Sequence, residues 1–161
     1  MAYMIEGLDP QKFRPLFAMD AGQLRDARAT RMAAGAEGKY PCRVSLEDAA
    51  PGDELALVHF TNHDVETPYR NSFAIYVREA ACAPARYIDR VPPILRGRPI
   101  SLRCYSEAGN LVAAGIALAD DVDAQLRTLL TIPEVAYIDA HNAMHGCFAA
   151  RINRYDGGHD E

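Results

Sequence analysis

The stretch that most constrains the fold is residues 135–153, VAYIDAHNAMHGCFAARIN, where apolar and polar side chains alternate on both sides of a short turn. Alternation with a period of two is typical of a strand that buries one face. The apolar sets are Ala136, Ile138 and Ala140 on the first strand and Phe148, Ala150 and Ile152 on the second. The stretch therefore predicts an antiparallel hairpin with one buried face.

The opposite faces of this hairpin carry the chemically capable side chains. With residues 142–146 as the loop, the expected pairs are His141 with Cys147, Asp139 with Ala149, and Tyr137 with Arg151. This register keeps both apolar sets on one side, whereas a slip of one residue would mix them. Directly opposed residues have Cβ atoms about 4.5–5.5 Å apart, so His141 and Cys147 are expected to be neighbours.

Cys147, His141 and Asp139 are therefore the candidate catalytic residues. A thiol beside a base, with a carboxylate that orients the base, is the arrangement that activates a cysteine nucleophile. The alternative is structural, because free cysteine often packs as a small hydrophobe and a histidine can satisfy loop backbone groups. Both interpretations stay open at this point.

Length and cysteine usage indicate one domain. A chain of 161 residues can bury about two-thirds of its unfolded surface, and we expect one domain over residues 1–155 with a disordered tail at 156–161. The four cysteines are widely spaced, and the start MAYMIEGLDP resembles no secretory signal. No apolar run reaches the ~20 residues that span a bilayer. These features predict a cytoplasmic protein without a membrane segment.

The charge balance bears on partners. A formal net charge of -5 and a pI near 5.5 disfavour nucleic acids and anionic membranes, which attract basic surfaces. We therefore expect no nucleic-acid partner.

The rest of the chain predicts an α+β fold, an antiparallel or mixed β-sheet with a few short helices in a single compact domain. Short helices are expected after Asp9 and Asp20, and the clearest one follows Asp120 or Asp121, with Val122 and Leu126 on its apolar face. Strands are expected at 2–7, 30–34, 41–46, 54–60 and 72–79, and a hairpin at 100–118.

Four arginines occupy alternate positions opposite apolar sets in these strands. They are Arg43, Arg78, Arg103 and Arg151, accompanied by Ser45, Tyr76, Tyr105 and Tyr137. Guanidinium groups bind carboxylate and phosphate in a fork geometry, so a shared face would hold a small anionic ligand. Tyr76 and Asn142 are further candidate contacts. The competing interpretation is a solvated face on which the arginines pair with acidic residues.

Metal and cofactor sites have little support. His59 and His63 are four residues apart, as are His141 and His145, but on a strand that spacing is about 13 Å. A zinc site from His141, His145, Cys147 and Cys42 is the remaining metal alternative. No C-x-x-C, nucleotide-binding or nucleophile-elbow motif is present, so no cofactor and no metal are expected. His159, in the tail, is not expected to belong to a site.

Three segments carry a family resemblance: GLDP with F-x-x-LF near the start, YPCRVSLEDA in the middle, and HNA-x-x-GCFAAR near the end. Together they resemble a bacterial family, the domain of unknown function numbered 1203. The resemblance spans about residues 5–154 and implies one compact cytoplasmic domain. It carries over no catalytic residue.

The functional expectation is a small-anion site on an arginine- and tyrosine-rich sheet face, with His141 and Cys147 at its rim. An interaction domain that self-associates as a homodimer is one alternative. A cysteine- and histidine-dependent enzyme is the other.

Overall fold

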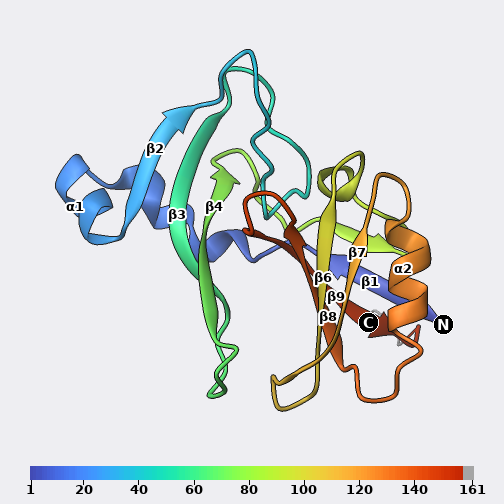
Figure 1. Ribbon diagram of the computed structural model, residues 1–161. Helices are drawn as coiled ribbons and strands as arrows, with labels where there is room; N and C mark the ends of the chain where they lie inside the picture. The colour runs from blue at the N-terminus through green and yellow to red at the C-terminus, as the bar shows by residue number, and fades with distance from the viewer. Residues whose placement is uncertain (158–161) are drawn as a thin grey trace.

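Two antiparallel sheets organise the chain in the computed structural model, which describes residues 1–157 (Figure 1). The strands of the larger sheet are β1 (Ala2–Glu6), β5 (Arg86–Ile88), β6 (Ile100–Tyr105), β7 (Leu111–Ala117), β8 (Tyr137–Asn142) and β9 (Phe148–Tyr155), in the order β5-β1-β9-β8-β6-β7. The smaller sheet contains β2 (Ala29–Ala33), β3 (Glu54–His63) and β4 (Asn71–Arg78), in that order. With only short helices beside these sheets, the predicted α+β class is confirmed.

Two of the five helices within residues 1–157 begin at side-chain caps that the sequence predicts. The 3-10 helices are η1 (Pro10–Lys12), η2 (Arg14–Ala18) and η3 (Pro93–Leu95), and the α-helices are α1 (Ala21–Asp26) and α2 (Val122–Leu129). Asp9 caps η1 by accepting a hydrogen bond from the Gln11 amide, and Asp20 forms a capping box with Gln23 at the start of α1. Local sequence therefore sets these starts.

The main core lies between the larger sheet and α2. Ile138 and Ile152 face each other across the β8–β9 ladder and are fully buried, and Leu126 of α2 packs into the same cluster. A Cβ added at Gly115 of β7 would lie 3.2 Å from a methyl carbon of Leu129, so α2 packs closely on this strand. The predicted apolar faces of the hairpin and helix are thus confirmed, except at Phe148, which is not part of this core cluster.

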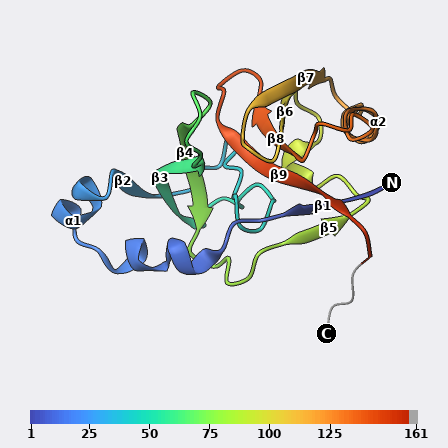
Figure 2. The same ribbon diagram turned by 90° about the horizontal axis from the view of Figure 1, so that it is seen from below.

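The smaller sheet lies on the other side of the larger one, away from α2 (Figures 1 and 2). Its own core is formed by Val58, Ile75 and Val77 together with Phe13 and Leu16 of the 3-10 helices. The larger sheet is therefore covered on both faces, and its polar face meets the smaller sheet.

Residues 41–46 do not form the expected strand. This segment runs between the two sheets (Figures 1 and 2). Isolated bridges connect Cys42 to Tyr76 of β4 and Pro41 to the nearby Asp48. The Leu46 amide bonds back to the Cys42 carbonyl at 2.9 Å, which closes a turn, and Leu46 has a positive φ of 55°. The apolar alternation arose because the segment is buried on all sides, and not because it is extended.

The predicted register of the β8–β9 hairpin is wrong by two residues. Asp139 pairs with Arg151 and Ala140 with Ala150, after which an irregularity places His141 opposite Phe148. A shift of two keeps residues 137–140 and 150–153 on their predicted faces, so the sheet stays amphipathic. The irregularity turns Phe148 to the face of His141 and Ala149 to the core, so the predicted faces of these two residues are wrong. Cys147 therefore lies in the loop and not opposite His141.

The loop accounts for this shift. The Asn142 amide bonds to the Cys147 carbonyl at 2.9 Å, and the Asn142 side-chain oxygen accepts bonds from the amides of Met144 and His145. Gly146 has a φ of +81°, a conformation that glycine adopts without steric cost.

No helix within residues 1–157 is long and apolar enough to cross a membrane. The expectation of a disordered tail at 156–161 falls mainly on residues 158–161, which lie outside the described part of the chain, as does His159.

Candidate functional site

One face of the larger sheet carries most of the predicted site residues and points toward the smaller sheet. Arg103 pairs with Asp139 across β6 and β8, and Asp139 pairs with Arg151 across β8 and β9. Tyr105 and Tyr137 are opposite one another on the same face. The polar face predicted from the alternation therefore exists, and it includes two of the four arginines.

Asp139 and Arg151 form an ion pair with two hydrogen bonds on this face. The carboxylate accepts bonds from Arg151 Nε at 2.7 Å and Nη2 at 2.9 Å, and the guanidinium lies 4.4 Å from the Tyr137 ring centroid. Burial lowers the pKa of Arg151, but the bonds to Asp139 outweigh it and raise the pKa overall. Because the carboxylate is fully buried, Arg151 serves first as its counter-charge.

His141 is buried and held by its own loop. Its Nδ1 lies 2.9 Å from the Gly146 carbonyl, which can only accept, so Nδ1 carries the hydrogen. Nε2 has no hydrogen-bond partner in the described residues, and the Phe73 and Phe148 rings meet the imidazole edge-on. Burial lowers the pKa of His141 to about 4. The imidazole is therefore neutral at pH 7.

The expected Cys147–His141–Asp139 relay is not assembled. Asp139 is bound by Arg151, and His141 donates to Gly146 instead of to a carboxylate. The reason is the two-residue shift in register, which places Asp139 opposite Arg151 and leaves Cys147 in the loop.

His63, the last residue of β3, packs against this polar face, whereas the sequence suggested it only as half of a metal pair. Its Nδ1 donates to the Tyr69 carbonyl at 2.9 Å, so its Nε2 accepts from the Tyr137 hydroxyl, also at 2.9 Å. The ring stacks on Tyr105 with centroids 3.9 Å apart. No sequence signal marks this network, because His63 and Tyr137 are 74 residues apart in the chain.

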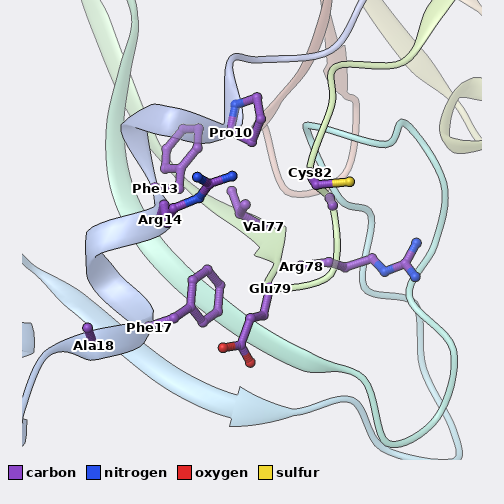
Figure 3. A pocket seen from close by; sticks show the side chains of 10 residues that line it. Pro10, Phe13, Arg14, Phe17, Ala18, Val77, Arg78, Glu79 and Cys82 are labelled. Carbon is purple, nitrogen blue, oxygen red and sulfur yellow. The ribbon is translucent and has the colours of Figure 1, made fainter.

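Arg78 lies in a different place from the other arginines. It lines a cavity of about 360 Å³ between the 3-10 helices and the end of β4. Figure 3 shows its side chain extending away from the rings of Phe13 and Phe17. It pairs with Asp53 at 3.1 Å. The four arginines therefore do not converge on a single hollow, because Arg43 and Arg78 belong to segments outside the larger sheet.

A second cavity, which we call the Arg43 cavity, gathers four of the predicted site residues. It has a volume of about 420 Å³ and lies between the smaller sheet and the β8–β9 loop. Its lining residues are Lys39, Pro41, Arg43, Leu57, Ala74, Tyr76, Arg98, Asn142, His145 and Cys147. Arg43, Tyr76, Asn142 and Cys147 were expected in a site, whereas Lys39 and Arg98 lie in irregular segments where no pattern marked them.

Arg43 is the most unusual residue of this cavity, because it is only 2% exposed yet has no acidic partner within ion-pair distance in residues 1–157. Its Nε donates to the Phe148 carbonyl at 2.8 Å, and Nη1 donates to the Pro41 carbonyl. Burial lowers the pKa of the guanidinium, whereas Cys147 acts to raise it through charge and hydrogen bonding. Carbonyl dipoles thus take the place of a counter-charge.

The backbone fixes Arg43 in this position. The Leu8 amide bonds to the Arg43 carbonyl at 2.7 Å, and the Arg43 amide bonds to the Tyr76 carbonyl at 3.1 Å. Segments from the start of the chain and from the smaller sheet therefore hold the residue from both sides.

The other charges around the cavity leave it cationic. Arg98 bonds to Asp48 at 2.6 Å, and Lys39 has no ion pair within the described chain. Three cations thus face the cavity, and one carboxylate offsets them. The Asn142 side-chain oxygen is used by the loop, so the group that Asn142 can offer to the cavity is its amide nitrogen.

The zinc alternative is not supported by the arrangement of its residues. Residues 1–157 contain no group of three or more histidine, cysteine or acidic side chains placed to hold a metal ion. Cys42, one of the suggested ligands, instead accepts contacts from the amides of Ser45 and Arg78.

Comparison with known proteins gives a family and no activity. No curated protein matches the chain, and no solved structure does. A family model described as a protein of unknown function, DUF1203, matches residues 39–154, which include β3 to β8, all of β9 except Tyr155, and every lining residue of the Arg43 cavity. Since this match covers well over half of the 161 residues, the chain belongs to the DUF1203 family of proteins of unknown function.

Proposed function

We propose that the Arg43 cavity binds a small anionic molecule, with Lys39, Arg43 and Arg98 as its cationic contacts. The observation that carries this proposal is the buried Arg43 guanidinium, which lines a cavity and lacks a carboxylate partner in the described residues.

The energetics favour an anion in this position. Removing a cation from water costs several kcal/mol, and carbonyl groups offset only part of that cost. An oxyanion in the cavity would add charge-assisted hydrogen bonds to a guanidinium whose planar donors match carboxylate and phosphate groups. The volume of about 420 Å³ lies within the range of small-molecule sites, roughly 300–1,000 Å³.

The test is thermal unfolding with inorganic phosphate or malonate at low ionic strength and constant pH. A ligand at a hundred times its Kd stabilises the folded state by about 2.7 kcal/mol, which raises the Tm of a chain of this size by roughly 5–10 °C. We expect this shift in the native protein and a smaller one in Lys39→Gln, since Lys39 is exposed and its loss should leave the fold intact.

The matched control is Arg70→Gln. Arg70 is an exposed cation outside the cavity that pairs with Asp64, so its loss changes the net charge equally. An equal response of Lys39→Gln and Arg70→Gln, or no shift in the native protein, would refute the site.

A second candidate function is self-association through β7, which lies at an edge of the larger sheet. Its ladder groups on one side have no strand partner within residues 1–157. The segment Leu111–Ala117 contains no charge, and Ile116 is 56% exposed. Natural edge strands usually carry charges or prolines that prevent pairing, so an uncharged edge favours a second copy of the same strand.

Light scattering over a range of protein concentrations tests this second function. We expect a dimer mass that Ile116→Lys reduces to a monomer, because the new charge would have to be buried. Ile88→Lys, on the short β5 at the opposite edge, is the control. A native protein that stays monomeric throughout would contradict the proposal.

A further inference from the structure

We propose that Cys147 is the reactive group of the Arg43 cavity, and that its thiol forms a covalent bond with an electrophilic carbon of an anionic molecule held by the cavity cations. This inference rests on the proposed anion site and deepens it, since it names the ligand class: a small carboxylate or phosphate compound that carries an electrophilic carbon.

The first argument is the position of Cys147 among the four cysteines. It is half-buried and lines the Arg43 cavity, whereas Cys42 and Cys104 are buried elsewhere and Cys82 is exposed at the cavity of Figure 3. Burial also raises the pKa of Cys104 to about 11, which keeps that thiol protonated. Cys147 is therefore the thiol that an anion in this cavity would meet.

The second argument is the charge beside the thiol. Arg43 is buried without a carboxylate partner among the described residues, and the group that most favours its charged form is Cys147. The same guanidinium faces the space in which the anion would be held, so nucleophile and ligand share one cationic environment.

The third argument is that the loop fixes Cys147. Its carbonyl accepts the Asn142 amide at 2.9 Å, and the next residue, Phe148, begins β9 and accepts from Arg43 Nε at 2.8 Å. The backbone that carries the thiol is thereby anchored by the hairpin on one side and by Arg43 on the other. A reactive group on a rigid element is positioned more precisely than one on a free loop.

His145 replaces His141 as the imidazole of this site. His141 donates through Nδ1 to Gly146 and does not line the cavity, whereas His145 does. The thiol proton would pass to His145 or to solvent.

The step is a nucleophilic substitution at carbon. The Cys147 sulfur forms a bond with the electrophilic carbon, the bond from that carbon to its leaving group breaks, and the leaving group departs with the electron pair. The thiol proton is the only other product, so no oxidant or reductant takes part.

Competing alkylation by iodoacetate and iodoacetamide tests the inference, because the two reagents differ mainly in charge. Both would transfer a substituted methylene to sulfur and release iodide. Labelling rates at each cysteine are measured by peptide mass spectrometry, with Cys82 and a neutral cysteine peptide as references. A cleft lined by one sign of charge raises the capture of an oppositely charged reactant by about tenfold or more.

We expect the rate ratio of iodoacetate to iodoacetamide to be at least about tenfold higher at Cys147 than at Cys82. The ratio should fall toward that of Cys82 in Lys39→Gln but not in Arg70→Gln, and inorganic phosphate should protect Cys147 alone. Equal ratios at the two cysteines, or labelling of Cys147 only after denaturation, would overturn the inference.

The outcomes separate the two proposals. If phosphate stabilises the protein in a way that depends on Lys39 but Cys147 is unreactive, the anion site is supported and the reactive thiol is refuted. Absence of the phosphate response would refute the anion site itself, whatever the thiol does.

Discussion

Asp139 lies opposite Arg151 in the β8–β9 ladder and accepts two hydrogen bonds from its guanidinium, at 2.7 and 2.9 Å. The carboxylate is fully buried between the sheets, and Asn62 is a more distant third contact at 3.5 Å. The pair therefore joins the larger sheet to β3 of the smaller sheet, because Arg151 also donates to the Asn62 carbonyl.

Removing the arginine from this pair should destabilise the fold strongly. Arg151→Met leaves a buried carboxylate without its partner, which costs about 3–5 kcal/mol in the free energy of unfolding. Urea denaturation measures this loss. The double variant with Asp139→Asn should recover part of it, because the uncompensated charge is gone. A control, Arg70→Met, breaks an exposed pair and should cost less than about 1 kcal/mol. A loss for Arg151→Met no larger than that control would contradict the structural role.

Stability should fall between pH 6.5 and pH 4 because of His141. Its folded-state pKa is lowered to about 4 from an ordinary 6.5, so the unfolded chain takes up the proton first as the pH falls. A shift of this size in a fully buried group contributes roughly 3 kcal/mol of lost stability across that window.

Unfolding free energies at pH 7 and pH 4.5 check this for the native protein and His141→Gln. The difference between the two pH values should be smaller in the variant, while acidic groups contribute equally to both. An identical pH dependence would show that His141 does not titrate this way.

Gly7 should not tolerate alanine. A Cβ at this position would lie 1.9 Å from the Val44 carbonyl oxygen, and the Gly7 amide is already bonded to Ala85. Gly7→Ala must displace the segment that carries Arg43, so we expect a loss of about 1–3 kcal/mol and weaker phosphate binding. Gly22→Ala in α1 is the matched control, since its Cβ meets only ordinary contact and alanine favours a helix. Equal effects of the two substitutions in thermal unfolding would argue against the close approach.

Asn142→Asp tests the effect of charge in the cavity while it preserves the hydrogen bonds of the loop. The aspartate keeps an oxygen for the amides of Met144 and His145, so the loop and the Tm should change little. It also places a negative charge in the cavity, where repulsion of about 1.4 kcal/mol or more should weaken phosphate binding about tenfold. Isothermal titration calorimetry measures the affinity. Asn142→Ala, which loses the loop bonds without adding charge, serves for comparison, and undiminished affinity in Asn142→Asp would place the anion elsewhere.

Local pattern determined most of the strands, their faces and the capped helices, but not β5 or the turn at residues 41–46. The alternation in residues 135–153 placed Ile138 and Ile152 in the core and Asp139 and Arg151 on the polar face, and both placements are confirmed. These predictions succeed because burial of one face follows a period of two in a strand, whatever the strand's neighbours are.

The register and the partners of the charges were decided only by the tertiary structure. A shift of two residues changes no face, so the alternation cannot detect it, and the Asn142 loop fixed it instead. Because of that shift, Asp139 binds Arg151 and does not form the expected relay with His141 and Cys147.

The Arg43 cavity is the clearest example of a feature that local sequence patterns do not predict. Its cations come from segments that no periodic pattern describes, and Arg43 lies in a stretch whose alternation imitated a strand. The sequence by itself determined that this chain would form an amphipathic β-rich domain, because hydrophobic periodicity is a local property. Which arginine would be buried without a carboxylate depended on contacts between residues as far apart as Arg43 and Phe148, and these exist only once the chain is folded.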